Sequence, residues 1–127
     1  MGEIYLQRRG MNKSLLPGYW DTAVGGHVSF GESIGEALRR EAGEELGLWD
    51  FNPIPMVEYI FDGNGEREFV HSFAIVGDFK PSPDPSEVSE GRWWSPREIE
   101  QNFDRCVLTP NFEQEYRRLE NAFSALL

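Results

Sequence analysis

Three glutamates near the middle of the chain are spaced so that a single helix would bring their carboxylates together. Glu41, Glu44 and Glu45 are separated by steps of three and four residues, and side chains at those steps share one helix face about 100° wide. Ile34 and Leu38 fall on the same side of the helix. The carboxylates are therefore expected beside the apolar stripe rather than opposite it.

Clustered carboxylates beside apolar side chains repel one another, and partial burial raises that cost further. The arrangement becomes favourable when a divalent cation lies among the carboxylates, and their hard oxygens suit Mg²⁺ or Mn²⁺. Arg40 adjoins the cluster and can orient or neutralise one carboxylate. A solvated helix in an acidic protein is the alternative interpretation, and helix geometry alone does not separate the two.

The residues around these glutamates form a longer motif. Gly26 is followed after five residues by Glu32, and after seven more by Arg40-Glu41-Ala42-Gly43-Glu44-Glu45-Leu46-Gly47-Leu48. Residues 26–48 resemble the Nudix box at every fixed position, with Ala42 as a small residue at an apolar one. The resemblance implies an α/β fold, the Nudix α/β/α sandwich with a mixed β-sheet. It also implies hydrolysis of a diphosphate linked to some other group.

The same resemblance implies roles for residues of the box. The implied ligands of Mg²⁺ or Mn²⁺ are Glu41, Glu44, Glu45, Glu32 and the backbone carbonyl near Gly26. Glu45 would be the central ligand, and Glu32 would be an additional ligand or act just behind the ligands. Arg40 would hold the carboxylates in place.

Hydrolysis also needs a group that takes a proton from water. Glu44, Glu41 and the more distant Glu68 are the candidates, and the sequence leaves the choice open. Glu87 and Glu90 compete for the same role.

Residues outside the box resemble the isopentenyl-diphosphate isomerase branch of the Nudix proteins. The matching segments are Gln7-Arg8-Arg9, Lys13, Pro17-Gly18-Tyr19-Trp20, Gly25-Gly26-His27, Glu66-Arg67-Glu68 and Thr109-Pro110. This resemblance implies that Arg9 and Lys13 reach the diphosphate, since an acidic protein needs local positive charge there. His27 matches a metal or acid position of the isomerase.

The isomerase chemistry itself is not expected. Gly25 stands where the isomerase has a cysteine, and Asn111 stands where it has an aromatic residue. We therefore expect a hydrolase of a nucleoside-diphosphate derivative or a similar small metabolite. An isomerase and a non-catalytic nucleotide sensor are the alternatives. Trp20 is a candidate to stack on a base, and burial in the core is its alternative role.

The elements expected to position these residues alternate between strands and helices. Strands are expected at residues 4–8, 23–30, 54–61, 68–76 and 91–94, and the Asp62-Gly63-Asn64-Gly65 turn predicts a hairpin. A helix should begin after Ser33, with Glu36 completing a capping box, and end at Gly47. Two further helices should start at Ser95-Pro96 and Thr109-Pro110. Phe112, Tyr116, Leu119 and Phe123 would form the buried face of the last helix.

Composition limits the class of protein. The 127 residues suit one domain over 1–127. The net charge of −10 argues against a nucleic-acid partner, and no stretch is long and apolar enough for a membrane span. A single cysteine, Cys106, fits the reducing cytoplasm. The expected partner is a small-molecule diphosphate.

The start of the chain carries a further expectation. Isomerase-like relatives carry a strand upstream of the segment at Ile4, so the sheet here would lack the usual first strand. A bare edge near residues 3–8 would be covered by the C-terminal helix or would pair with the same edge of a second chain, because an unpaired edge is a template for association. The expected outcome is a homodimer or a marginally stable monomer.

Overall fold

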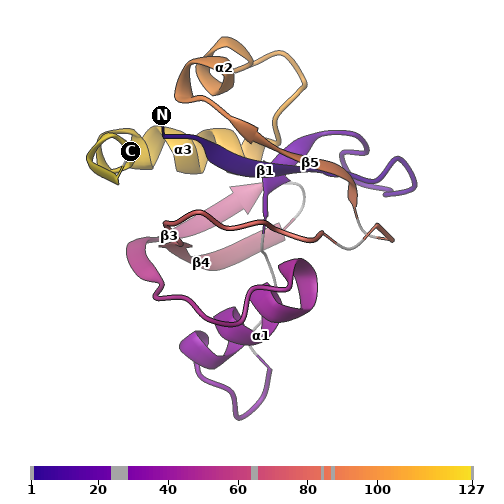
Figure 1. Cartoon of the computed structure of the whole chain (residues 1–127). Coiled ribbons are helices and arrows are strands. Elements are labelled where there is room, and N and C mark those ends of the chain that lie inside the picture. The colour runs from indigo at the N-terminus through magenta and orange to yellow at the C-terminus, as the bar shows by residue number, and fades with distance from the viewer. Residues whose placement is uncertain (1, 24–28, 64–65, 84, 87, 127) are drawn as a thin grey trace.

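The computed structural model describes residues 2–23, 29–63, 66–83, 85–86 and 88–126, without the side chains of 66, 68 and 121–126. Within these residues the order of elements is β1 (Ile4–Arg9), β2 (Trp20–Thr22), α1 (Ile34–Leu46), β3 (Ile54–Gly63), β4 (Glu66–Ala74), β5 (Val88–Trp94), α2 (Pro96–Gln101) and α3 (Pro110–Leu126). Figure 1 shows α1 on one side of the β3–β4 hairpin, with β1 and α2 on the other.

The first sheet has the order β2–β1–β5, and both pairings are antiparallel. Leu6 of β1 is aligned with Thr22 on one side and Arg92 on the other. The prediction of a bare edge is therefore wrong for residues 6–8, which are paired on both sides. A short strand at Trp20–Thr22 that the sequence did not reveal covers one side of β1, so the argument for a homodimer from that edge no longer applies.

The second sheet is the antiparallel hairpin of β3 and β4, paired from Ile54–Ala74 to Gly63–Glu66. This confirms the hairpin expected from the glycine-rich turn, of which residues 64–65 lie outside the described residues. A parallel bridge joins Trp20 to Leu108. The α/β fold class is confirmed, with antiparallel sheets and helices combined.

Helix α1 begins and ends where its capping residues predict. The Ser33 hydroxyl accepts a hydrogen bond from the Glu36 N–H, and the Glu36 carboxylate accepts one from the Ser33 N–H. Gly47 ends the helix at φ 69°, a left-handed conformation that glycine adopts without steric cost. The buried side of α1 carries Ala37, Ala42, Gly43 and Leu46, whereas Ile34 is exposed.

One face of the first sheet packs against α2 and α3 and forms the main core. Its buried members are Leu6, Trp20, Trp94, Ile99, Leu108, Phe112 and Tyr116. Phe112, Tyr116 and Leu119 are buried as the helical spacing predicted, and the side chain of Phe123 lies outside the described residues. Helix α2 starts with a capping box of Ser95 and Glu98, as expected.

Helix α3 also packs against β2 and β3, so it connects the two sheets. The last turn of α1 is connected to the segment that follows β4, because the Ser82 N–H donates to the Leu46 carbonyl at 3.0 Å. Among the described residues, none of the helices combines the length and the apolar character needed to cross a membrane.

Candidate carboxylate site on helix α1

Arg40 of α1 binds Glu32, which lies just before the helix. Arg40 Nε donates to Glu32 Oε2 at 2.8 Å, and Nη2 donates to Oε1 at 3.1 Å. The Ser29 N–H also donates to Glu32 Oε1, at 3.0 Å. A two-pronged contact between a guanidinium and a carboxylate fixes both groups in direction as well as distance. The segment entering α1 is thus attached to the middle of the helix.

The third nitrogen of the guanidinium faces the glutamates of the helix itself. Arg40 Nη1 lies 3.0 Å from Glu41 Oε1 and 3.4 Å from Glu44 Oε2. One arginine therefore contacts the carboxylates of Glu32, Glu41 and Glu44. The sequence predicted that Arg40 would orient or neutralise one carboxylate, and the resemblance implied that it holds several. In the structure Arg40 contacts three.

The glutamates differ in exposure. The side chain of Glu41 is 17% exposed and that of Glu32 16%, whereas that of Glu44 is 57% exposed. Glu45 is partly buried. The expectation that carboxylates would lie beside the apolar stripe is confirmed for Glu41, which follows the buried Ala37 by one turn and precedes the buried Ala42.

Charge pairing shifts the pKa values of both Glu32 and Arg40. Hydrogen bonds from Arg40, and then from the Ser29 N–H, lower the pKa of Glu32 to about 2. Hydrogen bonds to Glu32, and then to Glu41, raise the pKa of Arg40 above its ordinary value. Both groups are therefore charged across the whole physiological range, and their contact does not depend on pH there.

The donor set has the chemistry that Mg²⁺ or Mn²⁺ prefers, namely several carboxylate oxygens on one helix face. In the described part of the chain, however, no three acidic, histidine or cysteine side chains converge into a coordination shell. Arg40 draws the oxygens of Glu41 and Glu44 toward itself. The residues fit a divalent cation by type and by shared face, and rotation of these side chains is needed to enclose one.

Two of the residues predicted to bind substrate lie near the end of β1. Arg9 is partly buried and donates Nε to the Leu15 carbonyl at 3.1 Å. Lys13 follows in the loop and is partly exposed, with its N–H bonded to the Gly10 carbonyl at 3.2 Å. Their contact with a diphosphate stays a prediction.

Trp20, a candidate to stack on a base, instead has the alternative role considered for it, burial in the core. Trp20 is 8% exposed and packs edge-on against Trp94, with ring centroids 5.2 Å apart. Alternation along β2 sends this side chain into the core with Leu6, so both of its faces are occupied by protein.

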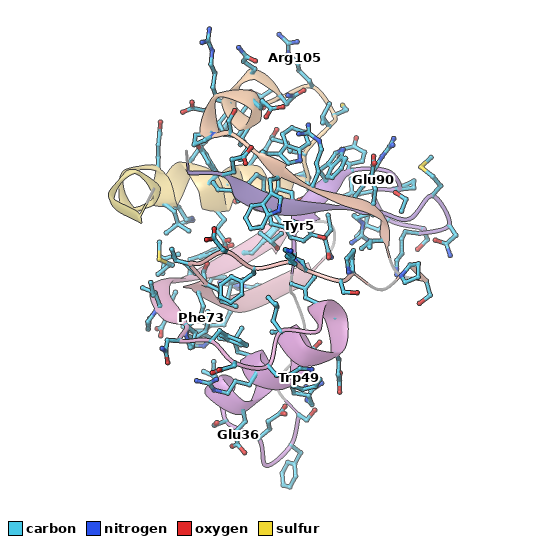
Figure 2. The ribbon with its side chains drawn as sticks, viewed as in Figure 1. Tyr5, Glu36, Trp49, Phe73, Glu90 and Arg105 are labelled. Carbon is cyan, nitrogen blue, oxygen red and sulfur yellow. The ribbon has the colours of Figure 1, made fainter. Side chains whose placement is uncertain are left out.

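Several predicted site residues lie outside the described residues, and their roles stay predictions. These are Gly26, His27, Glu87 and the side chains of Glu66 and Glu68. Glu90 is described, and it pairs with Arg8 across the first sheet at 3.6 Å. Figure 2 places Glu90 near the start of β5, well away from Glu36 of α1 and from Trp49, which follows this helix.

A second group of polar residues lies where the two sheets meet α3. Tyr59 Oη of β3 donates to Glu115 Oε1 of α3 at 2.8 Å, and Arg118 lies over the Tyr59 ring at 4.7 Å. Burial raises the pKa of Glu115, and it raises that of Asp21 on β2 against hydrogen bonds from Thr22 and Thr109. Sequence analysis missed this group because its members are far apart along the chain and match no motif.

Fold and site together define a layered α/β domain in which one helix carries an arginine-anchored set of carboxylates. The family model described as the NUDIX domain matches residues 1–115, which is most of the chain. The chain belongs to the Nudix family.

The relatives that it matches fall into two groups by name. The chain is 38% identical over 95 residues to an uncharacterized Nudix hydrolase of Pseudomonas aeruginosa, covering 75% of this chain and 56% of that protein. It is 34% identical to isopentenyl-diphosphate Delta-isomerase 1 of Photorhabdus laumondii, covering 98% of this chain and 76% of that protein. The chain therefore spans only about half to three quarters of the length of these relatives.

Solved structures show the same fold. A crystal structure of a Deinococcus radiodurans protein superimposes with a TM-score of 0.78 at 28% identity, covering 92% of this chain and 74% of that one. The MutT protein of Methanosarcina mazei gives a TM-score of 0.73 at 28% identity, covering 95% and 85%. The predicted Nudix fold is thus confirmed by comparison with solved structures.

Proposed function

We propose that this domain hydrolyses a diphosphate linkage in a nucleoside-diphosphate derivative or a similar small metabolite, with Mg²⁺ or Mn²⁺ as cofactor. The observation that carries the proposal is the contact of Arg40 with the carboxylates of Glu32, Glu41 and Glu44. A binding module has no need of so many acidic side chains fixed on one helix face. A hydrolase that handles an anionic substrate needs them to hold the neutralising cation.

Each carboxylate of α1 has a role that its environment suits. Glu41 and Glu45, both partly buried, would hold the cation together with Glu32 or the backbone near Gly26. When bound, the cation supplies positive charge at the diphosphate oxygens and makes water a stronger acid. Arg40 keeps Glu41 directed and neutralises part of the charge of the cluster while the site is empty of substrate.

Glu44 is the carboxylate that we assign to proton removal. It is the most exposed of the three that contact Arg40, and its distance of 3.4 Å from Nη1 is the longest. A general base must turn toward the attacking water, and a weakly held, solvent-facing carboxylate has that freedom. Glu41 and Glu68 are the other candidates for this step.

The reaction balances as a simple hydrolysis. The water oxygen forms a bond to one phosphorus as the bond from that phosphorus to the bridging oxygen breaks, and the water proton passes to Glu44. The leaving phosphate takes up a proton later. The products are a phosphate monoester and either a second monoester or inorganic phosphate. With one cysteine and a net charge of −10, the domain suits small-molecule chemistry in the cytoplasm.

The experiment is a phosphate-release screen over nucleoside diphosphate sugars, dinucleotides, nucleoside triphosphates and isoprenoid diphosphates, each with Mg²⁺, with Mn²⁺ and with chelator. We expect the protein to release phosphate from at least one nucleotide, and only when Mg²⁺ or Mn²⁺ is present. A folded protein that releases no phosphate from any of these substrates contradicts the proposal.

Isomerisation is retained as a second candidate because the Photorhabdus isomerase matches 98% of this chain. Gly25 and Asn111 oppose it, since neither supplies the thiol or the aromatic ring of the isomerase.

A further inference from the structure

Strand β5 is paired on one side only. The order β2–β1–β5 places it at the edge of the first sheet (Figure 1). No strand or loop among the described residues forms backbone hydrogen bonds with its outer side. An edge of this kind presents a row of N–H and C=O groups, which is a template for pairing with another chain.

The backbone of β1 shows which residues of β5 face outward. The Arg9 N–H donates to the Tyr19 carbonyl at 2.8 Å, so the backbone of Arg9 is directed away from β5. Successive residues of a strand direct their backbone groups to opposite sides, so those of Arg8 are directed toward β5. Arg8 is aligned with Glu90. The backbone of Glu90 therefore bonds to β1, and that of the next residue, Gly91, faces outward.

By the same alternation, the outward-facing backbone groups of β5 belong to Ser89, Gly91 and Trp93. Ser89 and Trp93 are exposed. The Trp93 carbonyl accepts a hydrogen bond from Nη1 of Arg92 at 3.3 Å, which agrees with a carbonyl directed away from β1. Gly91 is the middle residue of β5, and a Cβ atom there would collide with the Tyr5 hydroxyl oxygen. The middle of the edge therefore consists of backbone alone.

Two side chains of opposite charge flank Gly91. Glu90 is 54% exposed and Arg92 43%, and residues two apart in a strand lie on the same face of the sheet. Within the chain, Glu90 lies 3.6 Å from Arg8, and Arg92 lies 3.3 Å from Glu98. Exposed ion pairs of this kind are weak, so both side chains are free to exchange partners.

We propose that β5 pairs with β5 of a second copy of this chain, antiparallel about a two-fold axis through Gly91. The two three-stranded sheets then form one continuous sheet. Ser89 lies opposite the partner's Trp93, and Glu90 lies opposite the partner's Arg92. The outward-facing backbone groups of β5, which are unpaired along this edge within one chain, are hydrogen-bonded in the dimer.

The charges select this register over its neighbours. An axis through Glu90 would place Glu90 opposite the partner's Glu90, and an axis through Arg92 would place two arginines opposite each other. Like charges directly opposite one another destabilise a strand pair, whereas opposite charges stabilise it. Only the axis through Gly91 gives two attractive pairs, one on each side of the axis.

The association is measured by sedimentation velocity of the full chain from about 10 µM to about 1 mM, because an interface of one strand from each copy is small and binds weakly. We expect the sedimentation coefficient to rise with concentration. Hydrogen exchange by NMR at both ends of this range then locates the interface. The amides of Ser89, Gly91 and Trp93 should exchange about tenfold more slowly, or slower still, at the high concentration. The amides of Glu90 and Arg92, which bond to β1, should exchange at the same rate at both.

Two substitutions test the charge pairs. Glu90→Arg and Arg92→Glu each place like charges across the axis, and each should raise the dissociation constant about tenfold or more, since both pairs become repulsive. An equimolar mixture of the two variants has opposite charges at both pairs and should associate as wild type does. Glu3→Arg and Arg97→Glu make the same charge changes at exposed positions outside β5. They are the matched controls and should associate as wild type.

Thermal melts first establish that each variant is folded, because Arg92 also lies over the Trp94 ring at 3.7 Å. If Arg92→Glu does not fold, Ser89→Pro takes its place. This substitution removes an outward-facing N–H and no hydrogen bond to β1, and proline is tolerated at such edge positions. It should also weaken association about tenfold or more, since the proline cannot donate to the partner's Trp93.

A wild-type chain that stays monomeric over the whole concentration range overturns the inference. A dimer in which exchange of the outward-facing amides of β5 is independent of concentration does so too, because the two copies then meet at another surface. Unchanged association in folded Glu90→Arg and Ser89→Pro likewise contradicts the pairing. None of these measurements requires turnover, so their outcome is independent of the proposed hydrolysis.

Discussion

Arg40 and Glu32 are joined by two hydrogen bonds, of 2.8 and 3.1 Å, although seven residues lie between them in the chain. The pair attaches the segment before α1 to the centre of the helix, and the Nη1 atom of Arg40 contacts Glu41 and Glu44. Arg40 therefore positions Glu32 and Glu41, two of the carboxylates that we assign to the cation. This arrangement has measurable consequences for activity and for stability.

Arg40→Lys tests whether the shape of the guanidinium matters as well as its charge. A lysine keeps the positive charge but cannot contact Glu32, Glu41 and Glu44 in fixed directions. We expect kcat to fall about 100-fold, as for other misplaced catalytic groups, with a thermal midpoint that shows a folded protein. Arg97→Lys, at an exposed arginine of α2, is the control and should retain full turnover. Equal kcat in Arg40→Lys and wild type would mean that charge alone is sufficient.

The low pKa of Glu32 predicts a loss of stability in acid. The folded-state pKa of about 2 lies below the ordinary value of 4.5, so the unfolded state takes up this proton first. The stabilisation is present above pH 4.5 and is lost as the pH falls toward 2. Urea unfolding over this range should show a steeper decline for wild type than for Glu32→Gln. Parallel declines in the two proteins would contradict the assignment.

The raised pKa of Glu115 predicts a pH dependence of stability opposite in sign to that of Glu32. Burial raises its folded-state pKa, so the folded state retains the proton when the unfolded state has lost it. Its contribution to the free energy of unfolding therefore falls as the pH rises above the unfolded pKa. Glu115→Gln keeps an acceptor for Tyr59 and removes the titration. The difference in stability between Glu115→Gln and wild type should move in favour of the variant from about pH 4 to about pH 8. A difference that is constant with pH, with Asp21 unchanged in both proteins, would show that Glu115 does not titrate in this range.

The elements with strong local signals were predictable from sequence. Ser33 and Glu36 mark the start of helix α1 and Gly47 marks its end, because these capping interactions act within one helical turn. The hairpin followed from its glycine-rich turn. The α1 carboxylates also followed from spacing, because three- and four-residue steps define a helix face.

The parts that depend on contacts between distant residues were not predictable. Strand β2 has three residues and is stabilised by pairing with β1, so no local pattern marks it. The sequence predicted this strand only from Gly91, whereas β5 starts at Val88, because its first residues are held by pairing with β1 rather than by a local pattern. Asp21, Tyr59 and Glu115 meet only because α3 connects the two sheets.

We predict that this protein does not isomerise isopentenyl diphosphate, although some of its relatives are named as isomerases. Gly25 and Asn111 replace the cysteine and the aromatic residue that the resemblance associates with that reaction. Isopentenyl diphosphate incubated in deuterium oxide with the protein and Mg²⁺ should show no enzyme-dependent exchange by NMR. The Photorhabdus isomerase is the positive control. Exchange at a comparable rate would show that these two positions are not required.

The central claim is that α1 holds a divalent cation used in hydrolysis, and Glu45→Gln tests it most directly. The substitution removes one charge and keeps the shape of the side chain. On the best substrate of the phosphate-release screen, turnover should fall by about 100-fold or more, since even residues behind metal ligands cost 10–100-fold when changed. The thermal midpoint should stay close to that of wild type, and Glu3→Gln, at an exposed position, should retain full activity. Unchanged metal-dependent turnover in folded Glu45→Gln would contradict the account.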